Sequence, residues 1–271
     1  MTANNLHISN EMMSRKESPE PIIKVRNVTI SYGDNTILKD VSFDVYRGEV
    51  FIILGGSGCG KSSLMRQMIG LEQPATGEVL IDGEDIVTAE GANRFKLLRK
   101  FGVTYQNGAL FGSMTVLENV RLPLDEFTTL PIEAKNLIAR MKLSLVGLEE
   151  FTNHLPSEIS GGMQKRAALA RAMALDPDIL FLDEPSAGLD PITSAGLDAL
   201  ITRLSNTLNA TFVVVTHELP SIFSIADRVI MLDKRKKAIV ATGTPVELRD
   251  HSDNDWVRSF FNREEAPEGI E

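Results

Sequence analysis

The sequence predicts an α/β fold in which a buried parallel strand leads into a phosphate-binding loop. A continuous apolar run at 50–54 is typical of a strand covered on both faces. Apolar residues recur at helical spacing after the loop, up to a stop at Gly70. Between strand and helix the chain reads Gly55-Gly56-Ser57-Gly58-Cys59-Gly60-Lys61-Ser62. Strand, loop and helix therefore occur in the order that a phosphate cradle requires.

The loop matches the G-x-x-x-x-G-K-[ST] pattern at every fixed position, which indicates a P-loop NTPase (RecA-like) core that binds ATP or GTP. Glycines let several backbone N–H groups face one anion, and the new helix adds its positive end. We expect Lys61 to reach the β- and γ-phosphates and Ser62 to ligate Mg²⁺. A glycine-rich turn that binds nothing is the disfavoured alternative. The expected nucleotide contacts of the loop are Gly55, Gly56, Ser57, Gly58, Cys59, Gly60, Lys61, Ser62 and Ser63.

Composition limits the class of protein and of partner. The 271 residues include 43% hydrophobic and 24% charged residues, as in an ordinary globular protein. The net charge of -9 disfavours nucleic acid as a partner, because such surfaces need clustered Lys and Arg. No apolar run approaches the roughly 18 residues of a membrane span, and the N-terminus has no apolar signal core. We therefore expect a soluble, cytoplasmic protein with no nucleic-acid partner.

Cys59 is the only cysteine, so an internal disulfide is excluded and a reducing compartment is favoured. Its place in the loop suits a small residue that fits there better than a catalytic thiol. We expect that a thiol reagent reaching this side chain would block nucleotide binding.

The N-terminal part of the chain is predicted to be a disordered leader followed by strands. Residues 1–21 are polar and end in Ser18-Pro19-Glu20-Pro21, a composition typical of disorder. The β pattern then begins, and it predicts an antiparallel β subdomain around the first part of the core. Strands are expected over 22–31, 41–45, 50–54, 77–83 and 103–106, and a helix over 94–100.

The middle of the chain, about 108–176, is predicted to be an α-helical subdomain inserted into the core. Thr115 and Glu118 form a capping box, since hydroxyl and carboxylate can each satisfy a free backbone donor. Pro131 suits the start of a second helix that runs to about residue 146. A third, alanine-rich helix is expected over 163–175.

The remaining elements complete a domain that we place at 22–250. A buried strand at 179–182, a helix capped by Asp190 and a strand at 212–215 come first. A helix at 221–226, a hairpin at 234–237 and a helix opened by Thr244 follow. Residues 251–271 are predicted to hold a C-terminal amphipathic helix and a tail.

Two carboxylates, Asp183 and Glu184, follow the strand at 179–182. In P-loop NTPases an aspartate at this position helps to hold Mg²⁺. Glu184 is then placed to polarise an attacking water, and a positioned general base contributes roughly 10²- to 10⁴-fold in rate. Two acidic residues at a strand end are common, but next to the glycine loop they indicate catalysis.

Ser160, Gly161 and Gly162 precede the alanine-rich helix and form a second helix start suited to an anion. With this motif upstream of Asp183 and Glu184, residues 22–250 resemble the ATPase subunit of an ABC transporter. The resemblance implies ATP and Mg²⁺ as ligands, with Ser62, Gln106 and Asp183 at the metal and Lys61, Glu184 and His217 as catalytic residues. It also implies that Tyr32 stacks on adenine and that His217 contacts the γ-phosphate. Gln106 would relay the nucleotide state to the membrane partner. Residues 160–164 would form the signature loop, and residues 186–190 the loop that crosses between the two subunits.

The signature departs from the usual Leu-Ser-Gly-Gly-Gln, because Ile159 stands first and Met163 replaces the glutamine. We expect activity to survive, since the serine and the glycine N–H groups hold most of the phosphate.

Further short matches resemble the ATPases of Mla (maintenance of lipid asymmetry) phospholipid transport systems of Gram-negative bacteria. That resemblance implies a peripheral protein on the cytoplasmic face of the inner membrane, bound through an integral-membrane permease. A small regulatory subunit and a lipid-binding substrate protein are candidate further partners. The matches are Gln106–Phe111, Asn119-Val120, Pro123-Leu124, Glu126, Thr128, Leu130-Pro131, Asp190–Thr193 and Ser224–Asp227.

One chain has a single copy of each anion-binding helix start, so the resemblance implies a head-to-tail pair of identical chains. Ser160–Gly162 of one subunit would close over ATP on Lys61 of the other, at a two-fold interface. We favour the phospholipid transporter. The ATPase of a small-molecule importer and a soluble ABC ATPase of an assembly or repair complex remain as alternatives, and a catalytically dead module is the least favoured.

Overall fold

The computed structural model describes residues 20–264. The predicted disorder of residues 1–19 lies outside the described residues, as does the end of the tail from 265. Pro21, the last residue of the predicted leader, instead begins the first strand and pairs with Tyr46. None of the helices within 20–264 is both long and apolar enough to cross a membrane.

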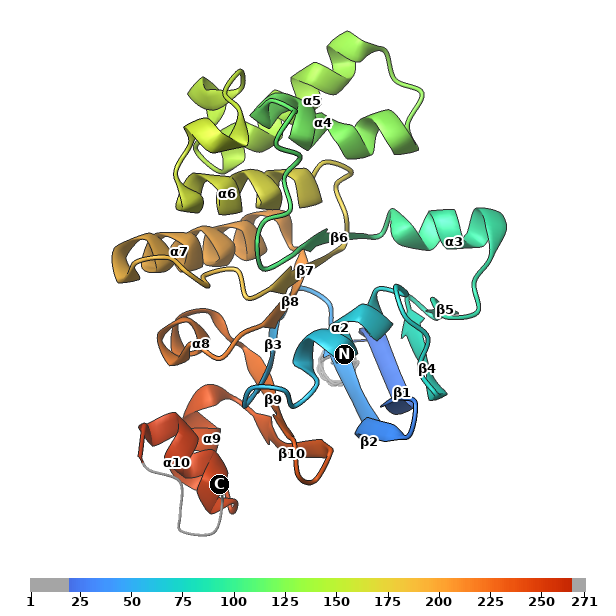
Figure 1. Ribbon diagram of the computed structural model, residues 1–271, viewed down its shortest axis with the longest axis vertical. Helices are drawn as coiled ribbons and strands as arrows, with labels where there is room; N and C mark the ends of the chain where they lie inside the picture. Colours follow the sequence, from blue (N-terminus) through green and yellow to red (C-terminus); the bar gives the residue numbers. More distant parts are fainter. Residues whose placement is uncertain (1–19, 265–271) are drawn as a thin grey trace, which may run out of the picture.

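Strands and helices alternate over residues 179–233, whereas the described part of the chain begins with consecutive strands and has consecutive helices in its middle (Figure 1). In order they are β1 (Pro21–Tyr32), β2 (Asn35–Tyr46), β3 (Val50–Gly55), α2 (Lys61–Met68), β4 (Thr76–Ile81), β5 (Glu84–Asp85), α3 (Gly91–Leu98), β6 (Phe101–Thr104), α4 (Val116–Phe127), α5 (Ile132–Leu145), the 3-10 turns η1 (Glu149–Phe151) and η2 (Pro156–Glu158), α6 (Gly161–Ala172), β7 (Ile179–Asp183), α7 (Pro191–Leu208), β8 (Thr211–Val215), α8 (Leu219–Ile225), β9 (Arg228–Asp233), β10 (Ala238–Gly243), α9 (Pro245–His251) and α10 (Asp255–Asn262).

Two sheets form the framework and confirm the predicted fold class. The larger has the order β10-β9-β3-β8-β7-β6, parallel except for the edge strand β10. The smaller has the order β2-β1-β4-β5 and is antiparallel throughout. In the large sheet β3 lies between β8 and β9, so the loop after β3 leaves from the middle of the sheet. Loops at the carboxyl ends of such parallel strands are where open α/β sheets bind ligands.

Alternate residues of the central strands pack into two separate cores. Ile52 and Leu54 face the core shared with α6 and α7, whereas Phe51 and Ile53 face the core shared with α2 and the small sheet. Every residue of β3 is buried, because both faces of the sheet are covered. The buried sheet therefore fixes the position of the loop that follows it.

Helices α4, α5 and α6 form a layer at the top of Figure 1, between β6 and β7 in the chain. The predicted capping box is present, since the Thr115 hydroxyl accepts from the Glu118 N–H at 3.2 Å and the Glu118 carboxylate accepts from the Thr115 N–H at 2.8 Å. The boundaries that we predicted for this subdomain, about 108 and 176, stay a proposal.

Several element ends differ from the sequence prediction. Strand β6 covers Phe101–Thr104, so Gln106 lies in a loop rather than a strand. Helix α6 begins at Gly161, ahead of the predicted start at Met163, because the Ser160 hydroxyl caps it by accepting from the Met163 N–H at 3.3 Å. Helix α3 begins at Gly91 rather than 94, and the short β5 was not predicted.

Candidate functional site

The first residue of the loop between β3 and α2, Gly55, has no room for a side chain. Gly55 has φ +153°, and a Cβ there would lie 2.5 Å from the Leu232 carbonyl oxygen and 2.6 Å from the Cys59 Sγ. Gly60, in the left-handed region at φ +101°, precedes α2, which has no side-chain cap. The first N–H groups of α2 are therefore left for another acceptor, and an anion is the natural one.

Lys61 folds back over this loop. Its Nζ donates to the carbonyl oxygens of Gly55 at 2.8 Å and Gly56 at 3.2 Å. The ammonium is thus held beside the loop and lines the pocket described below, and its contact with phosphate stays a prediction.

Cys59 does not present its thiol to this site. The side chain is 1% exposed and belongs to the core between the sheets. Burial raises the pKa of the thiol, although Lys61 nearby opposes the shift. The expectation that a thiol reagent would reach Cys59 and block nucleotide binding is therefore wrong for the folded chain, because a buried neutral thiol is unreactive. Cys59 can contribute only its backbone to a nucleotide.

Ser62, in the first turn of α2, lies close to Asp183, the last residue of β7. The Ser62 Oγ donates to the Asp183 Oδ1 at 3.2 Å. Burial raises the pKa of Asp183, the Ser62 hydrogen bond opposes this shift, and the neighbouring Glu184 adds to it. A hydroxyl and a half-buried carboxylate are oxygen ligands of the kind that Mg²⁺ prefers, so these residues fit the predicted metal.

Glu184 is the most constrained acidic residue of the site. Its backbone has φ +47°, a region that costs energy for any residue except glycine, and it is 8% exposed. Its Oε1 lies 2.8 Å from the His217 Nδ1, while its buried Oε2 has no hydrogen-bond partner. This carboxylate oxygen therefore keeps acceptor capacity that no group of the described residues uses.

Lys61, Ser62, Glu184 and His217 line one open pocket of about 620 Å³, whereas Asp183 and Cys59 are not among its lining residues. The pocket brings together most of the residues that the sequence predicted, and it adds Ile37 and Phe260. Phe260 comes from α10, and the only sequence signal for it was its place in an amphipathic segment. The lining is Ile37, Gly55, Gly56, Ser57, Gly58, Gly60, Lys61, Ser62, Ser63, Gln106, Glu184, His217 and Phe260.

Tyr32 is not among the residues that line this pocket. Its ring is 48% exposed, and its hydroxyl donates to the Glu72 Oε2 at 2.5 Å. The role of Tyr32 against adenine stays a prediction.

The signature residues also lie apart from the pocket. Ser160 and Gly161 are exposed at the start of α6, whereas Gly162 is buried against α7. A Cβ on Gly162 would lie 2.4 Å from the Thr193 Cγ2, so a larger residue would require the Thr193 side chain to move. None of the three lines the pocket of the same chain, so their contact with a nucleotide stays a prediction.

A second hollow, of about 450 Å³, lies between β6, α4 and the end of α6. Its walls are mostly apolar, with one acidic and one basic side chain. They are formed by Leu98, Phe101, Gly102, Val103, Tyr105, Ala109, Phe111, Leu122, Pro123, Glu126, Phe127, Arg171, Ala172 and Leu175. A wide apolar hollow on a protein surface is suited to a partner segment rather than to a small polar ligand.

Lys165 is a residue of the site that sequence reasoning missed. It lies on α6, and its Nζ donates to the Gln106 carbonyl oxygen and lies 3.5 Å from the Glu184 carbonyl oxygen. Burial lowers the pKa of Lys165, and Glu184 and Asp183 oppose the shift. Nothing in the sequence marked this lysine, because its partners are backbone atoms of distant segments.

Comparison with known proteins relates the chain to one family. Residues 38–187 match the sequence profile described as ABC transporter. The chain is 40% identical over 247 residues to "Intermembrane phospholipid transport system ATP-binding protein MlaF" of Escherichia coli K12, covering 91% of each chain. It is 42% identical over 240 residues to "Probable ribonucleotide transport ATP-binding protein mkl" of Mycobacterium leprae, covering 89% of this chain and 68% of that one.

Solved structures agree. A dimeric ATP-binding cassette in a post-hydrolysis state, bound to ADP and Pi, superposes with a TM-score of 0.74 at 33% identity, covering 82% of this chain and 98% of the other. A Clostridium perfringens protein described as part of the ABC transporter complex cbiONQ superposes with a TM-score of 0.78 at 28% identity, covering 86% and 92%.

Proposed function

The chain belongs to the ABC transporter family as an ATP-hydrolysing subunit, and we propose that it drives phospholipid transport between the membranes of a Gram-negative envelope. One observation carries the choice of substrate. The match to MlaF extends over 91% of both chains, and it agrees with the resemblance of residues 106–111 and 119–131 to Mla ATPases. The match to the mkl protein has a similar identity, but it covers only 68% of the mkl protein.

Two copies of the chain form the working unit in this proposal. The pocket around Lys61 holds ATP, and the exposed start of α6 at Ser160 and Gly161 is left for the nucleotide of the other copy. The dimeric cassette bound to ADP and Pi is a solved precedent among the relatives. If the closed dimer binds ATP more tightly than the open one, nucleotide binding closes the pair and hydrolysis reopens it.

The polar residues in and beside the pocket have distinct roles in hydrolysis in this proposal. The loop N–H groups and Lys61 bind the phosphates, and Glu184 Oε2 accepts the proton of the attacking water. His217, held at 2.8 Å from Glu184, orients that carboxylate and faces the same pocket. Ser62, Asp183 and Gln106 would hold Mg²⁺. The bound ion would neutralise negative charge on the phosphates.

The apolar hollow between β6, α4 and α6 is the proposed docking site for a membrane-embedded permease. Phe111, 51% exposed at its rim, belongs to the stretch that resembles Mla ATPases. Gln106 lines the nucleotide pocket and Phe111 lines this hollow, so the loop from Gln106 to Phe111 connects the two sites. Docking there would place the chain on the cytoplasmic face of the inner membrane.

A detergent pull-down from membranes through a tag on the chain tests the proposal. Bound proteins and bound lipids are both identified by mass spectrometry. Recovery of a permease, a lipid-binding partner and phospholipid is the expected result. Recovery of a permease with small solutes, including ribonucleotides, would support the importer instead, and recovery of soluble partners alone would overturn the transporter.

The docking surface is tested in the same experiment. We expect Phe111→Glu to reduce permease recovery at least about tenfold, because a charge would be buried against an apolar partner. Val246→Glu, at a residue 50% exposed on α9, is the matched control and should leave recovery unchanged.

A further inference from the structure

Helix α6 supplies two cations to the loop that carries Gln106. The Lys165 Nζ donates to the Gln106 carbonyl oxygen, and Arg171 donates to the carbonyl oxygens of Gly108 at 2.9 Å and Ala109 at 2.8 Å. Gly108 and Ala109 both have positive φ, so this stretch is folded tightly against the helix. The loop between the nucleotide pocket and the apolar hollow is therefore held by side chains of one helix.

Lys165 differs from Arg171 because it reaches a second segment. Its Nζ also lies 3.5 Å from the backbone carbonyl oxygen of Glu184. One ammonium group thus touches the backbone of the residue proposed to ligate metal and of the residue proposed to be the base. It does so from the helix whose first turn carries the signature residues.

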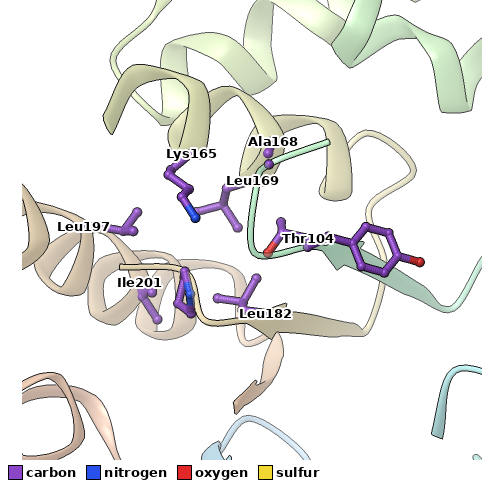
Figure 2. Close-up of a pocket in the computed structure, with 10 residues that line it drawn as sticks. Thr104, Lys165, Ala168, Leu169, Leu182, Leu197 and Ile201 are labelled. Atoms are coloured by element: carbon purple, nitrogen blue, oxygen red, sulfur yellow. The ribbon is translucent and has the colours of Figure 1, made fainter. Parts of the chain in front are cut away.

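The two carbonyl oxygens are backbone acceptors for the half-buried Lys165 ammonium. Figure 2 shows the side chain descending from α6 toward Leu182 and Ile201. The gap beneath it measures about 10 Å³, at the lower limit for a single water molecule, and its walls are largely apolar. Lys165 is half-buried, which makes a cation without acceptors costly, so the two carbonyl contacts favour this position of its side chain.

We propose that Lys165 is a positioning residue for hydrolysis. Its ammonium links the backbone of Gln106 and Glu184 to α6, so that both side chains reach their working positions only when α6 is docked on the sheet. Movement of the helical layer would then change the geometry of Glu184 without any contact between that layer and the nucleotide of the same chain. The proposal rests on the roles proposed above for Glu184 and Gln106, and it does not depend on which substrate is transported.

The test uses the full-length chain and its steady-state ATPase activity. Lys165→Met keeps the length of the side chain and removes its charge and donors. We expect kcat to fall about tenfold or more, as for loss of charge-assisted hydrogen bonds, while the Kd for the fluorescent analogue mant-ATP stays within about threefold. Lys165→Arg keeps charge and donors and should restore kcat to within about threefold of the unsubstituted chain.

A double substitution separates positioning from a general structural effect. If Lys165 acts through Glu184, adding Lys165→Met to Glu184→Gln should lower the residual single-turnover rate less than about twofold further. Lys96→Met, at an exposed lysine of α3, is the matched control and should leave kcat and the melting temperature unchanged.

Several results would overturn the proposal. They are an unchanged kcat for Lys165→Met, an equal loss of kcat and of mant-ATP affinity, an inactive Lys165→Arg, or a full tenfold loss in the Glu184→Gln background. If Lys165→Met shows no cooperative melting transition, Lys165→Gln takes its place under the same criteria. Normal turnover by Glu184→Gln alone would refute the base assignment separately, and Lys165→Met would then still report on the link to Gln106.

Discussion

His217 and Glu184 are in direct contact in the lining of the pocket, with the Nδ1 of the histidine 2.8 Å from the Oε1 of the carboxylate. The other carboxylate oxygen is buried and has no hydrogen-bond partner, and the glutamate backbone is held at φ +47°. A strained residue with one oxygen fixed and one free is expected where a proton must be accepted at a defined place.

Glu184→Gln should therefore trap the ATP-bound dimer. The amide keeps the shape of the side chain but cannot accept the proton, so kcat should fall by roughly 10²- to 10⁴-fold. ATPase assays measure the loss, and size-exclusion chromatography with ATP should show a dimer that the unsubstituted chain forms only briefly. Normal turnover in this variant would refute the assigned base.

Lys61→Ala should weaken nucleotide binding rather than chemistry alone. Removing a charged donor to phosphate is expected to raise the Kd for ATP by about 10- to 100-fold, measured by isothermal titration calorimetry. Lys96→Ala, which removes an exposed lysine of α3, serves as the control. An unchanged Kd in Lys61→Ala would show that Lys61 is not a phosphate contact.

The position of the pocket could be predicted from the sequence because its parts are local. The glycine loop, the apolar strand before it and the carboxylates after β7 each occupy a short continuous segment. The capping box at Thr115 was likewise predictable, since its partners are three residues apart. Local backbone chemistry is what sequence patterns encode best.

What the sequence did not reveal depends on packing between distant segments. Lys165 meets Gln106 and Glu184 through backbone carbonyl oxygens, which carry no residue-specific pattern. Phe260 lines the pocket from α10, which packs against α9, and its sequence indicated only an amphipathic helix. The thiol of Cys59 points into the core although its neighbours form the binding loop.

Asp183→Asn should stabilise the nucleotide-free chain while it removes metal binding. Because burial raises the pKa of Asp183 in the folded chain, the folded state binds this proton more tightly than the unfolded state. Ionisation of the carboxyl therefore costs folding free energy, and the cost is full above the folded pKa and absent below the ordinary value of 3.8. At pH 7 the variant should melt higher, on the order of 1–2 °C, since an amide has no charge to bury.

Scanning calorimetry across pH checks this sign. The difference in melting temperature between Asp183→Asn and the unsubstituted chain should shrink as pH falls toward 3.8. Mg²⁺ added with ATP should stabilise the unsubstituted chain more than the variant. A variant that melts lower at pH 7, or that gains as much from Mg²⁺, would contradict the metal role.

Cys59 should react with a maleimide only when the protein unfolds. Its thiol is 1% exposed, and burial keeps its pKa raised, so the reactive thiolate is both rare and shielded. Labelling followed by mass spectrometry should therefore be slow in buffer, accelerate through the thermal transition and slow further with ATP, which stabilises the folded state. Ala92→Cys in a Cys59→Ser background places a thiol on the exposed start of α3. This thiol should be labelled rapidly while the protein is still folded. Rapid labelling of Cys59 in the folded chain, with loss of nucleotide binding, would mean that the glycine loop opens far enough to expose the core beneath it.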